Sequence, residues 1–350
     1  MASFLLPRRL STRVAVALIS VVTAVSLAAC SSGGDSGDSA ASGNLKLQTS
    51  WIPLVQFGGS YLAEKHGFYK ANGVNVDILP GGPEVDSMAA LASGQADIAM
   101  GNADTVARAN AQGADLVIIA AGFQKNPLAV LSTPDKPIRT PADMAGKKIG
   151  VPSNDEASQS AVLAHNHIPE SSVTSVPVSF DIAPLVSGEV DGLWSFYAEQ
   201  PVAYQEKTGK TPVTMLAADY GFDVYAQVYA VRRSTLQDAA SRKSIEGFLK
   251  GEIQGWQAYV QNPAEAAEVT VNEYAKNGGL TVEEQTKQAQ RQLDLLVTPD
   301  TKAHGLLWVS DDGINHNVST LTELGVKGVS KSLFDTSLLH DIYQGRNTVS

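Results

Sequence analysis

The chain has 350 residues, of which 43% are hydrophobic, and its 26 Lys and Arg against 36 Asp and Glu give a formal net charge of −10. This acidic balance argues against a general nucleic-acid-binding protein, which needs a basic face to replace phosphate counterions. The single cysteine, Cys30, has no partner for an internal disulfide and cannot build a cysteine-rich zinc or iron–sulfur centre. The length and apolar content allow two modest domains or one large one.

Residues 1–29 have the pattern of an export signal. Three arginines, the last of them Arg13, lie ahead of an apolar stretch over residues 14–25 that is too short to predict a mature transmembrane span. Residues 27–30 read Leu-Ala-Ala-Cys and resemble the lipobox of bacterial lipoproteins. That resemblance implies cleavage before Cys30 and lipidation of its thiol. A plain secretory signal is the alternative, and the sequence does not separate Sec from twin-arginine export.

Residues 30–44 predict a lipid anchor followed by a flexible tether, because residues 31–43 contain no apolar side chain larger than Ala. Removal of the signal takes away three arginines and no acidic residue, so the net charge falls from −10 to −13. No later apolar run approaches the ~20 residues of a membrane span. We therefore expect a folded domain that is lipid-anchored at the extracytoplasmic face of the cell membrane.

Short apolar strands alternate with helical patterns from residue 45 onward, which is typical of an α/β protein with parallel strands. In the first set a helix is predicted over residues 58–71, and Pro83 suits the first position of another helix. The strands predicted in the first set are residues 45–49, 74–79, 96–100 and 116–121, and those in a second set are residues 148–151, 175–178, 192–194 and 213–216. The rest of the chain is predicted to be mostly helical, with helices over residues 234–260, 263–276 and 282–296.

Two similar motifs indicate an internal repeat. Leu91-Ala-Ser-Gly-Gln-Ala-Asp97 and Leu185-Val-Ser-Gly-Glu-Val-Asp191 share Leu, Ser, Gly and Asp at the same offsets. In each motif the glycine ends a helix and the aspartate precedes an apolar strand. Helices, turns and strands follow one another in this way in many α/β proteins, so a chance match is one interpretation. The other is a pair of similar lobes with one motif in each.

These features together resemble the solute-binding lipoproteins of ABC importers, and in particular the nitrate/sulfonate/thiamine-precursor group with its pyrimidine-binding, NMT1-like members. The resemblance implies a type II periplasmic-binding-protein-like α/β fold, with a ligand cleft between two lobes and two hinge crossings. The first lobe would comprise residues 45–131 and 225–350, and the second lobe residues 132–224. The stretches that carry the resemblance are Tyr61-Leu-Ala-Glu-Lys-His-Gly-Phe-Tyr69, Gly94-Gln-Ala-Asp-Ile98, Val106-Ala-Arg108 before Gly113, Thr140-Pro-Ala-Asp-Met-Ala-Gly-Lys-Lys-Ile-Gly150, Gly188-Glu-Val-Asp191 and Asp219-Tyr-Gly221.

Ligands of open α/β sheets bind beyond the carboxyl ends of the strands. In this chain these positions are rich in aromatic and acidic side chains and contain a single base, Lys125. Binders of fixed anions usually add an arginine, whereas facing aromatic rings suit a flat ligand and a carboxylate suits a ring amino group. The pattern favours a neutral or cationic heteroaromatic ligand. The candidate binding residues are Trp51, Gly82, Asn102, Asp104, Asp181, Trp194, Tyr197, Glu199 and Tyr225.

The resemblance assigns roles to three of these residues. In the pyrimidine-binding members, a Trp after the first strand and a Tyr of the second lobe stack on the ligand, and a Glu two residues beyond that Tyr binds its amino group. Trp51, Tyr197 and Glu199 occupy the matching positions. Packing in the core or hinge is the alternative for both aromatic residues and for Trp194. The turn Pro80-Gly-Gly-Pro83 resembles that of flavin-binding relatives, which take a larger tricyclic ring.

The implied function is the extracytoplasmic solute-binding component of an ABC importer, a monomer that presents a small heteroaromatic ligand to the transmembrane subunits of a permease. An aminopyrimidine precursor of thiamine is the favoured ligand, and riboflavin or an alkanesulfonate, taurine or nitrate are the alternatives. No cofactor, metal, nucleic acid or catalysis is expected. Fungal pyrimidine synthases share the resemblance, but they carry a cysteine-rich motif that this chain lacks. A lipoprotein sensor or adhesin would have the same sequence features.

Overall fold

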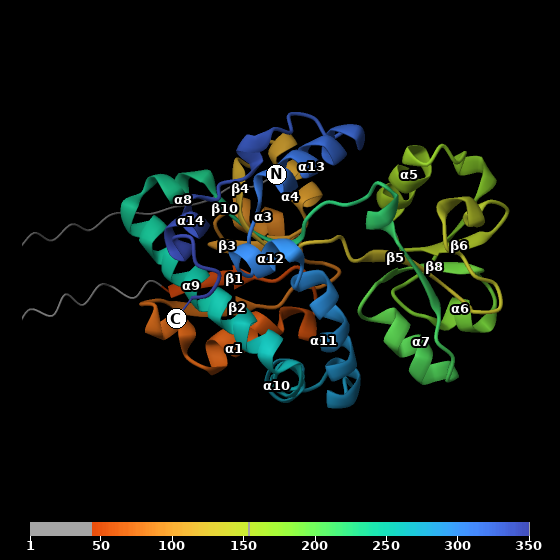
Figure 1. Ribbon diagram of the computed structural model, residues 1–350, viewed down its shortest axis with the longest axis horizontal. Coiled ribbons are helices and arrows are strands. Elements are labelled where there is room, and N and C mark those ends of the chain that lie inside the picture. The colour runs from red at the N-terminus through yellow and green to blue at the C-terminus, as the bar shows by residue number, and fades with distance from the viewer. Residues whose placement is uncertain (1–43, 153–154, 350) are drawn as a thin grey trace, which may run out of the picture. The chain divides into compact units, whose positions relative to one another are not determined.

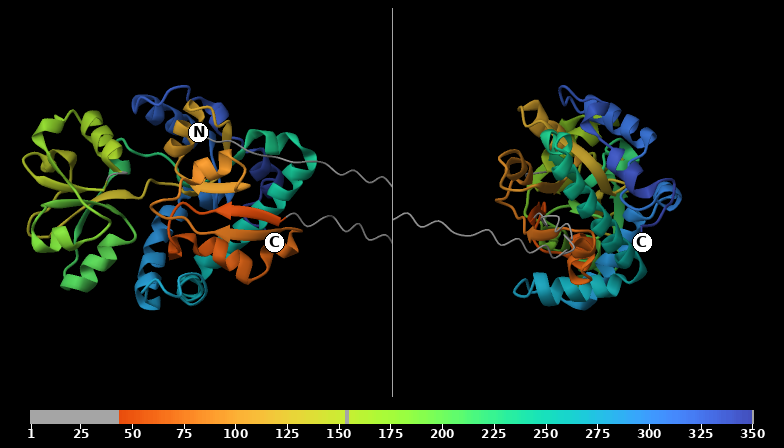
Figure 2. Two further views of the ribbon diagram at one scale, coloured as in Figure 1. Left: turned by 180° about the vertical axis from the view of Figure 1, so that it is seen from behind. Right: turned by 90° about the vertical axis from the view of Figure 1, so that its left-hand side faces the viewer.

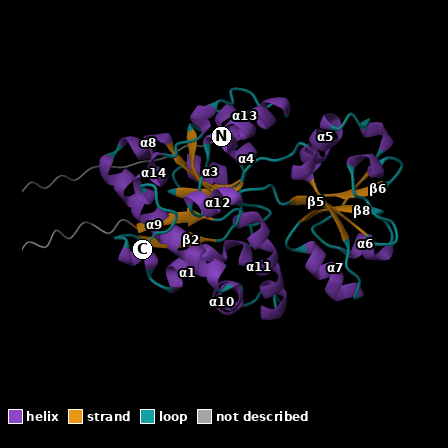
Figure 3. Ribbon diagram, viewed as in Figure 1, coloured by secondary structure: helices purple, strands orange, loops and turns teal. Residues whose placement is uncertain are grey.

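The computed structural model describes residues 44–152 and 155–349. The predicted signal, Cys30 and nearly all of the predicted tether therefore lie outside the described residues. In the described part, two five-stranded mixed sheets are each flanked by helices (Figures 1 and 3), which confirms the predicted α/β class. No helix of this part combines the length and the apolar character that crossing a membrane requires.

Both sheets have the same kind of strand order. The first is β2-β1-β3-β10-β4 and the second is β7-β6-β8-β5-β9. The three leading strands of each sheet are parallel, and one antiparallel strand, β10 or β5, separates them from the last strand. Figure 2 shows β1 and β2 side by side at the start of the colour range. The strands are β1 Asn44–Gln48, β2 Asn75–Leu79, β3 Ile98–Gly101, β4 Leu116–Phe123, β5 Leu128–Ser132, β6 Lys148–Val151, β7 Thr174–Pro177, β8 Gly192–Phe196, β9 Val213–Leu216 and β10 Ala226–Arg232.

Helices lie between successive strands of each sheet, and most of the remaining helices follow β10. The α-helices are α1 Gly58–Lys65, α2 Phe68–Ala71, α3 Ser87–Ala92, α4 Ala103–Ala111, α5 Glu156–His165, α6 Ala183–Ser187, α7 Gln200–Thr208, α8 Arg233–Gln237, α9 Ala239–Gln261, α10 Pro263–Val269, α11 Val282–Leu296, α12 Pro299–His304, α13 Asp311–Glu323 and α14 Ser337–Tyr343. Short 3-10 or π turns lie at Val55–Phe57, Pro141–Met144, Glu170–Ser172, Ala217–Tyr220, Thr270–Tyr274 and Lys331–Leu333.

Two predicted helices differ from the structure for local reasons. The helix expected over residues 58–71 is divided into α1 and α2, because Gly67 adopts a φ of 72° that interrupts the helical backbone. Pro83 does not begin the next helix. Instead α3 begins at Ser87, where the carboxylate of Asp86 accepts a 3.0 Å hydrogen bond from the backbone N–H of Ala89. The side-chain oxygen of an aspartate before a helix accepts a hydrogen bond from a backbone N–H of the first turn, and proline has no side-chain oxygen that could do so.

The chain passes between the two sheets twice, and a buried asparagine joins the two passages. The first passage follows β4, and β5 pairs within the second sheet from Leu128 onward. The second passage follows β9 and ends where β10 joins the first sheet. Asn126 donates its backbone N–H to Asp223 Oδ1 at 3.1 Å and its side-chain amide to the carbonyl of Val224 at 3.1 Å. The backbone N–H of Leu128 donates in turn to Asn126 Oδ1 at 3.0 Å.

The repeated motif has the same geometry in both sheets. Asp97 accepts a hydrogen bond from the backbone N–H of Lys46 at 2.9 Å, and Asp191 accepts one from the backbone N–H of Lys148 at 3.1 Å. The backbone N–H of each aspartate also donates to the carbonyl of the same lysine. The glycines of the two motifs have φ values of 80° and 79°. The match between the motifs therefore reflects one turn that joins a helix to the third parallel strand of each sheet.

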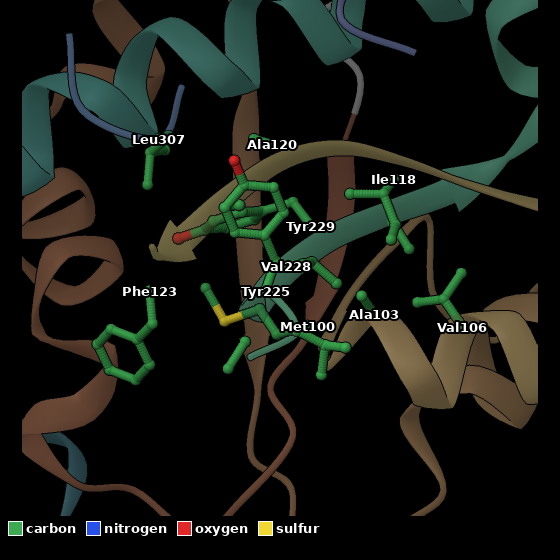
Figure 4. Close-up of a cluster of buried hydrophobic side chains, with 14 of the residues drawn as sticks. Met100, Ala103, Val106, Ile118, Ala120, Phe123, Tyr225, Val228, Tyr229 and Leu307 are labelled. Carbon is green, nitrogen blue, oxygen red and sulfur yellow. The ribbon is translucent and has the colours of Figure 1, made fainter. Parts of the chain in front are cut away.

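The core of the first sheet combines apolar packing with one buried carboxylate. Side chains from β3, β4, β10 and α4 meet around Met100 and Phe123 (Figure 4). Against another part of this sheet, the carboxylate of Glu252 on α9 is fully buried. Its oxygens accept hydrogen bonds from the side chains of Ser60, Tyr69, Tyr229 and Trp256. A buried carboxylate is tolerated here because donors surround it.

Candidate functional site

Two aromatic side chains meet at the ends of strands from different sheets. Trp51 lies in the loop after β1, and Phe180 lies in the loop after β7. Their ring centroids are 5.1 Å apart with an interplanar angle of 64°, which is an edge-to-face contact. Trp51 is half-buried, and Phe180 is 42% exposed. The pair offers apolar ring surface at the edge where ligands of such sheets bind.

The loop of Trp51 is fixed by Gly81, the neighbour of the predicted ligand-binding residue Gly82. The backbone N–H of Gly81 donates to the carbonyl of Trp51 and to Thr49 Oγ1, both at 3.0 Å. A Cβ atom on Gly81 would lie 2.4 Å from the carbonyl oxygen of Thr49, so a side chain does not fit there. A Cβ atom on Gly82 would have its closest contact at 3.7 Å, an ordinary distance. Gly81 is therefore the glycine of this turn that the fold requires.

Tyr197 is held against α11. Its hydroxyl donates to Asp294 Oδ2 at 3.1 Å, and the guanidinium carbon of Arg291 lies 4.4 Å from the centre of its ring. The same arginine donates through Nε to the carbonyl of Tyr197 at 3.1 Å. No ring contact joins Tyr197 to Trp51 in the described part of the chain. In this conformation the aromatic partner of Trp51 is Phe180, and a stack between Trp51 and Tyr197 remains a prediction.

Glu199 lies immediately before α7 and is half-buried. Burial, and secondarily the negative charge of Glu284, raises the pKa of its carboxyl from 4.5 to about 7. Among the residues that the structure describes, no hydrogen bond or ion pair engages this carboxyl. The carboxyl of Glu199 thus has no donor among the described residues, and its role in binding a ring amine stays a prediction.

Asn102 and Asp104 lie at the start of α4. The backbone N–H of Asn102 donates to Thr105 Oγ1 at 3.0 Å, which fixes the first turn of the helix. Asp104 is in that turn, where burial raises the pKa of its carboxyl and Arg108, 3.8 Å away, acts in the opposite direction. The charge of Asp104 in turn contributes to raising the pKa of Asp155, a residue that follows strand β6 of the second sheet.

Asp155, which precedes α5, is a buried acceptor at a predicted strand end, although it was not in the final set of predicted binding residues. The residue is 7% exposed, and its Oδ2 has no hydrogen-bond partner among the described residues. Burial, followed by the charge of Asp104, raises the pKa of its carboxyl from 3.8 to about 7. Its place at the end of β6 was the only sequence signal, because its burial depends on packing that a sequence pattern does not show.

Gln227 is a second acceptor that sequence reasoning missed. It lies in β10, is 1% exposed and has a φ of 51°, in the region that non-glycine residues rarely adopt. Its backbone N–H points to Asn102 Oδ1 at 3.4 Å, and its Nε2 donates to the carbonyl of Gln56 at 2.9 Å. Its Oε1 has no partner among the described side chains and backbone groups. Strained residues of this kind are frequent at ligand sites.

The other predicted binding residues have different surroundings. Asp181 is exposed, and its carboxylate accepts a 2.9 Å hydrogen bond from the backbone N–H of Ala183. Trp194 is 1% exposed, and its indole N–H donates to Gln159 Oε1 at 2.9 Å, so it packs in the core of the second half. Tyr225 is buried beside the second passage between the sheets, where its backbone N–H donates to Asn317 Oδ1 at 2.7 Å.

Two cavities of the described chain do not have Trp51 in their lining. One has a volume of about 640 Å³ and contains Tyr225 in its lining. Another, of about 550 Å³, lies between α7 and α11. The lining of the first comprises Gln124, Asp223, Tyr225, Thr298, Pro299, Asp300, His304, Ser310, Asp311, Asp312, Gly313, His316 and Asn317.

The acceptor oxygens at the strand ends and at the starts of α5 and α7 indicate the chemistry of the candidate site. Glu252 in the core shows that this chain surrounds a structural carboxylate with donors. Asp155 and Gln227 each have a buried acceptor oxygen without such a donor in the described residues, and the carboxyl of half-buried Glu199 has no hydrogen-bond partner there. An unpaired buried acceptor costs about 1–3 kcal/mol, and a ligand that supplies N–H groups recovers this cost. The site therefore suits a ligand with hydrogen-bond donors and an aromatic ring.

The two similar sheets and the two passages between them give the chain the fold of the periplasmic binding proteins. The periplasmic aliphatic sulphonate binding protein SsuA of Escherichia coli has this fold: the TM-score is 0.62 at 15% identity, and the alignment covers 84% of this chain and 91% of that protein. The chain belongs to the NMT1/THI5-like family, whose sequence model matches residues 55–266. The predicted fold and family are both confirmed.

Two curated relatives have sequences similar to most of the chain. The formylaminopyrimidine-binding protein of Halalkalibacterium halodurans is 24% identical over 257 residues, which cover 72% of this chain and 77% of the relative. The riboflavin-binding protein RibY of Chloroflexus aurantiacus is 26% identical over 252 residues, which cover 69% of this chain and 70% of the relative. Both relatives are named for the binding of a nitrogen heterocycle.

Asp155→Asn should stabilise the protein above neutral pH. The pKa of Asp155 is higher in the folded chain than in the unfolded chain, so its carboxyl favours folding below about pH 4 and this contribution is lost as the pH rises to about 7. The rise in pKa from 3.8 to about 7 corresponds to at most about 4 kcal/mol in the free energy of unfolding. Urea unfolding at several pH values should show that the free energy of unfolding of Asp155→Asn exceeds that of the wild type. The difference should grow from pH 4 to pH 7 and stay constant at higher pH. Exposed Glu156→Gln is the matched control, and equal losses of stability at all pH values for Asp155→Asn would contradict this prediction.

Proposed function

We propose that this protein is the extracytoplasmic solute-binding component of an ABC importer and that its ligand is an aminopyrimidine precursor of thiamine. The observation that carries this proposal is the lack of a donor, among the described residues, at the carboxyl of Glu199 and at the buried Oδ2 of Asp155, together with the ring surface of Trp51 and Phe180. An aminopyrimidine supplies both an aromatic face and an exocyclic amino group. A carboxylate that accepts from such an amino group is one of the stronger types of hydrogen bond.

The comparisons support a heterocycle over an oxyanion. The relatives named for formylaminopyrimidine and riboflavin match most of this chain. A sulfonate or nitrate would need donors at helix N-termini or an arginine fork. The residue before α5 is the buried carboxyl Asp155, which repels an anion at that helix start. Riboflavin is the second candidate, because the RibY relative has an identity similar to that of the formylaminopyrimidine-binding relative.

We also propose that the ligand is bound without chemical change and passed to the transmembrane subunits of a permease. Binding proteins of this architecture close their two lobes around the solute by hinge motion. Asn126 and the segment that contains Asp223 would form the hinge. In this proposal the protein acts as a monomer, and a lipid on Cys30 retains it at the outer face of the cell membrane. The mature net charge of −13 plays no part in ligand choice, which depends on the few groups at the site.

Isothermal titration of the purified protein tests the ligand class. We expect micromolar or tighter binding of an aminopyrimidine, weaker binding of riboflavin and thiamine, and no heat of binding with taurine or nitrate. Micromolar or tighter binding of taurine or nitrate, with none of the heterocycles, would show that the proposed ligand class is wrong. Riboflavin as the tightest ligand would favour the second candidate.

Removal of the aromatic face or of the carboxylate should weaken binding of the aminopyrimidine. Trp51→Ala deletes the ring surface, and Glu199→Gln replaces the acceptor pair by an amide that offers one acceptor and two donors. Each change should cost more than ~1 kcal/mol, or about fivefold or more in affinity. Glu189→Gln, at an exposed glutamate ten residues earlier, is the matched control for charge and should not change the affinity. Wild-type affinity in both Trp51→Ala and Glu199→Gln would place the site elsewhere.

Lipid anchoring at Cys30 is tested by fractionation of bacterial cells that express the full chain. Cys30→Ser removes the only thiol of the chain, so the protein should move from the membrane fraction to the soluble extracytoplasmic or culture fraction. Ser31→Ala is the control and should leave the protein in the membrane fraction. Persistence of the Cys30→Ser protein in the membrane fraction would refute lipidation at this position.

A further inference from the structure

One face of helix α11 is fixed to the half of the fold that contains the first sheet. The backbone N–H of Val55, after β1, donates to Gln285 Oε1 at 2.8 Å, and the backbone N–H of Gln124, after β4, donates to the carbonyl of Leu295 at 2.9 Å. Gln292 accepts from a buried tyrosine hydroxyl of α9 at 3.0 Å, and both glutamines of α11 are fully buried. These hydrogen bonds make α11 part of the first half.

The opposite face of α11 contacts the half that contains the second sheet. Lys287, Arg291 and Asp294 are spaced i, i+4 and i+7, so they lie on one side of the helix. Lys287 Nζ is 2.9 Å from Glu206 Oε1 on α7. Arg291 Nε donates to the carbonyl of Tyr197, the residue after β8, at 3.1 Å, and the hydroxyl of Tyr197 donates to Asp294 Oδ2 at 3.1 Å. We call these five residues the α11 contact (Figure 1).

The α11 contact is polar rather than a packed apolar interface. The cavity of about 550 Å³ between α7 and α11 has a polar lining apart from Val202. The side chains of Lys287 and Glu206 are 44% and 37% exposed. Charged groups that already meet water are readily rehydrated when they separate, whereas separation of packed apolar faces exposes hydrocarbon to water. The contact is therefore of a kind that forms and breaks easily.

The Lys287–Glu206 pair lies away from the passages between the sheets. Leu295, at the other end of α11, is bonded to Gln124 at the start of the first passage. Lys287 precedes Leu295 by eight residues, which is about 12 Å along a helix. A rotation of one sheet relative to the other at the passages displaces groups in proportion to their distance from them. The pair is thus sensitive to the relative orientation of the sheets.

We propose that the α11 contact stabilises the conformation in which the strand-end loops of the two sheets meet. In the structure that contains this contact, the rings of Trp51 and Phe180, from loops of different sheets, are 5.1 Å apart. An exposed ion pair contributes little free energy and is screened by salt, so it biases the arrangement of the sheets without locking it.

The same contact should set the ligand affinity, and this part of the inference rests on the proposed function. Apparent affinity falls in proportion to the population of the binding-competent conformation. Loss of the Lys287–Glu206 pair lowers that population although neither residue is a candidate binding residue. Tyr197, which is one, is held by Arg291 and Asp294 of the same contact.

Distance measurements in the unliganded protein test the conformational effect. Spin labels at Lys70→Cys, on α2, and Glu170→Cys, before β7, occupy exposed positions of the two halves, and Cys30→Ser removes the native thiol. Double electron–electron resonance in 0.1 M KCl should give one main distance peak. Glu206→Gln should at least double the population outside this peak. Raising KCl to 1 M should act in the same direction, because the Debye length falls from about 10 Å to about 3 Å.

The second carboxylate that binds Lys287 provides the matched control. Glu283 Oε1 lies 2.8 Å from Lys287 Nζ, but Glu283 belongs to α11 itself and does not join the two halves. Glu283→Gln should therefore leave the distance distribution unchanged. Glu206→Lys should enlarge the outlying population further, and combining it with Lys287→Glu should return the distribution toward that of the wild type, which also shows that the variants fold.

Titration of an aminopyrimidine with the same variants tests the effect on affinity. Glu206→Gln should weaken binding about three- to fivefold, and Glu206→Lys should weaken it more. The pair Glu206→Lys and Lys287→Glu should bind within about twofold of the wild type. Glu283→Gln should bind as tightly as the wild type.

The outcomes separate this inference from the proposed function. If Glu206→Gln leaves the distances unchanged, or if Glu283→Gln alters them equally, the role of the α11 contact is refuted and the proposed function stands. If the distances respond but no pyrimidine binds, the proposed ligand is wrong and the conformational role stands. If they respond while Glu206→Gln binds as tightly as the wild type or more tightly, the contact does not favour the binding-competent conformation and the inference is wrong.

Discussion

The buried side chain of Asn126 is the interaction on which the arrangement of this protein depends most. The side chain of Asn126 is hydrogen-bonded to Val224 and Leu128 and its backbone N–H to Asp223, so this residue joins the two passages of the chain between the sheets. The passages allow β5 and β10 to enter their sheets as antiparallel strands, so both sheets acquire the same strand order. The carboxyl ends of the parallel strands then present their loops for a ligand, as in other open α/β sheets. The location of the candidate site thus follows from the two passages of the chain between the sheets.

The candidate site differs from the core in whether its buried polar groups have hydrogen-bond partners. Glu252 is buried among four donor side chains, and its neighbourhood needs no ligand. Asp155 and Gln227 are almost as buried, but each keeps an oxygen without a partner among the described residues. Such groups lower the stability of the folded chain, because folding removes their water without replacing it by donors. Retaining them is consistent with binding, since a ligand with matching donors gains the free energy that folding has lost.

Much of the fold was predictable from the sequence because it follows local patterns. The strand predicted at residues 213–216 has the observed bounds of β9, and the aspartates of the repeat mark the same turn in both sheets. The site was less predictable because its contacts join distant parts of the chain. Tyr197 is held by Arg291 on α11, and the ring that meets Trp51 is Phe180. The burial of Asp155 and the strained backbone of Gln227 likewise depend on tertiary packing, which residue type and spacing do not encode.

A crystal structure of the protein with a bound aminopyrimidine tests the central claim most directly, because it shows which atoms contact the ligand. The account predicts the pyrimidine ring against the indole of Trp51, with its exocyclic amino group within hydrogen-bonding distance of the carboxylate of Glu199. It also predicts that donors of the ligand approach acceptors that are free in the present structure. A ligand bound in the cavity beside Tyr225, with Trp51 and Glu199 making no contact to it, would contradict the account.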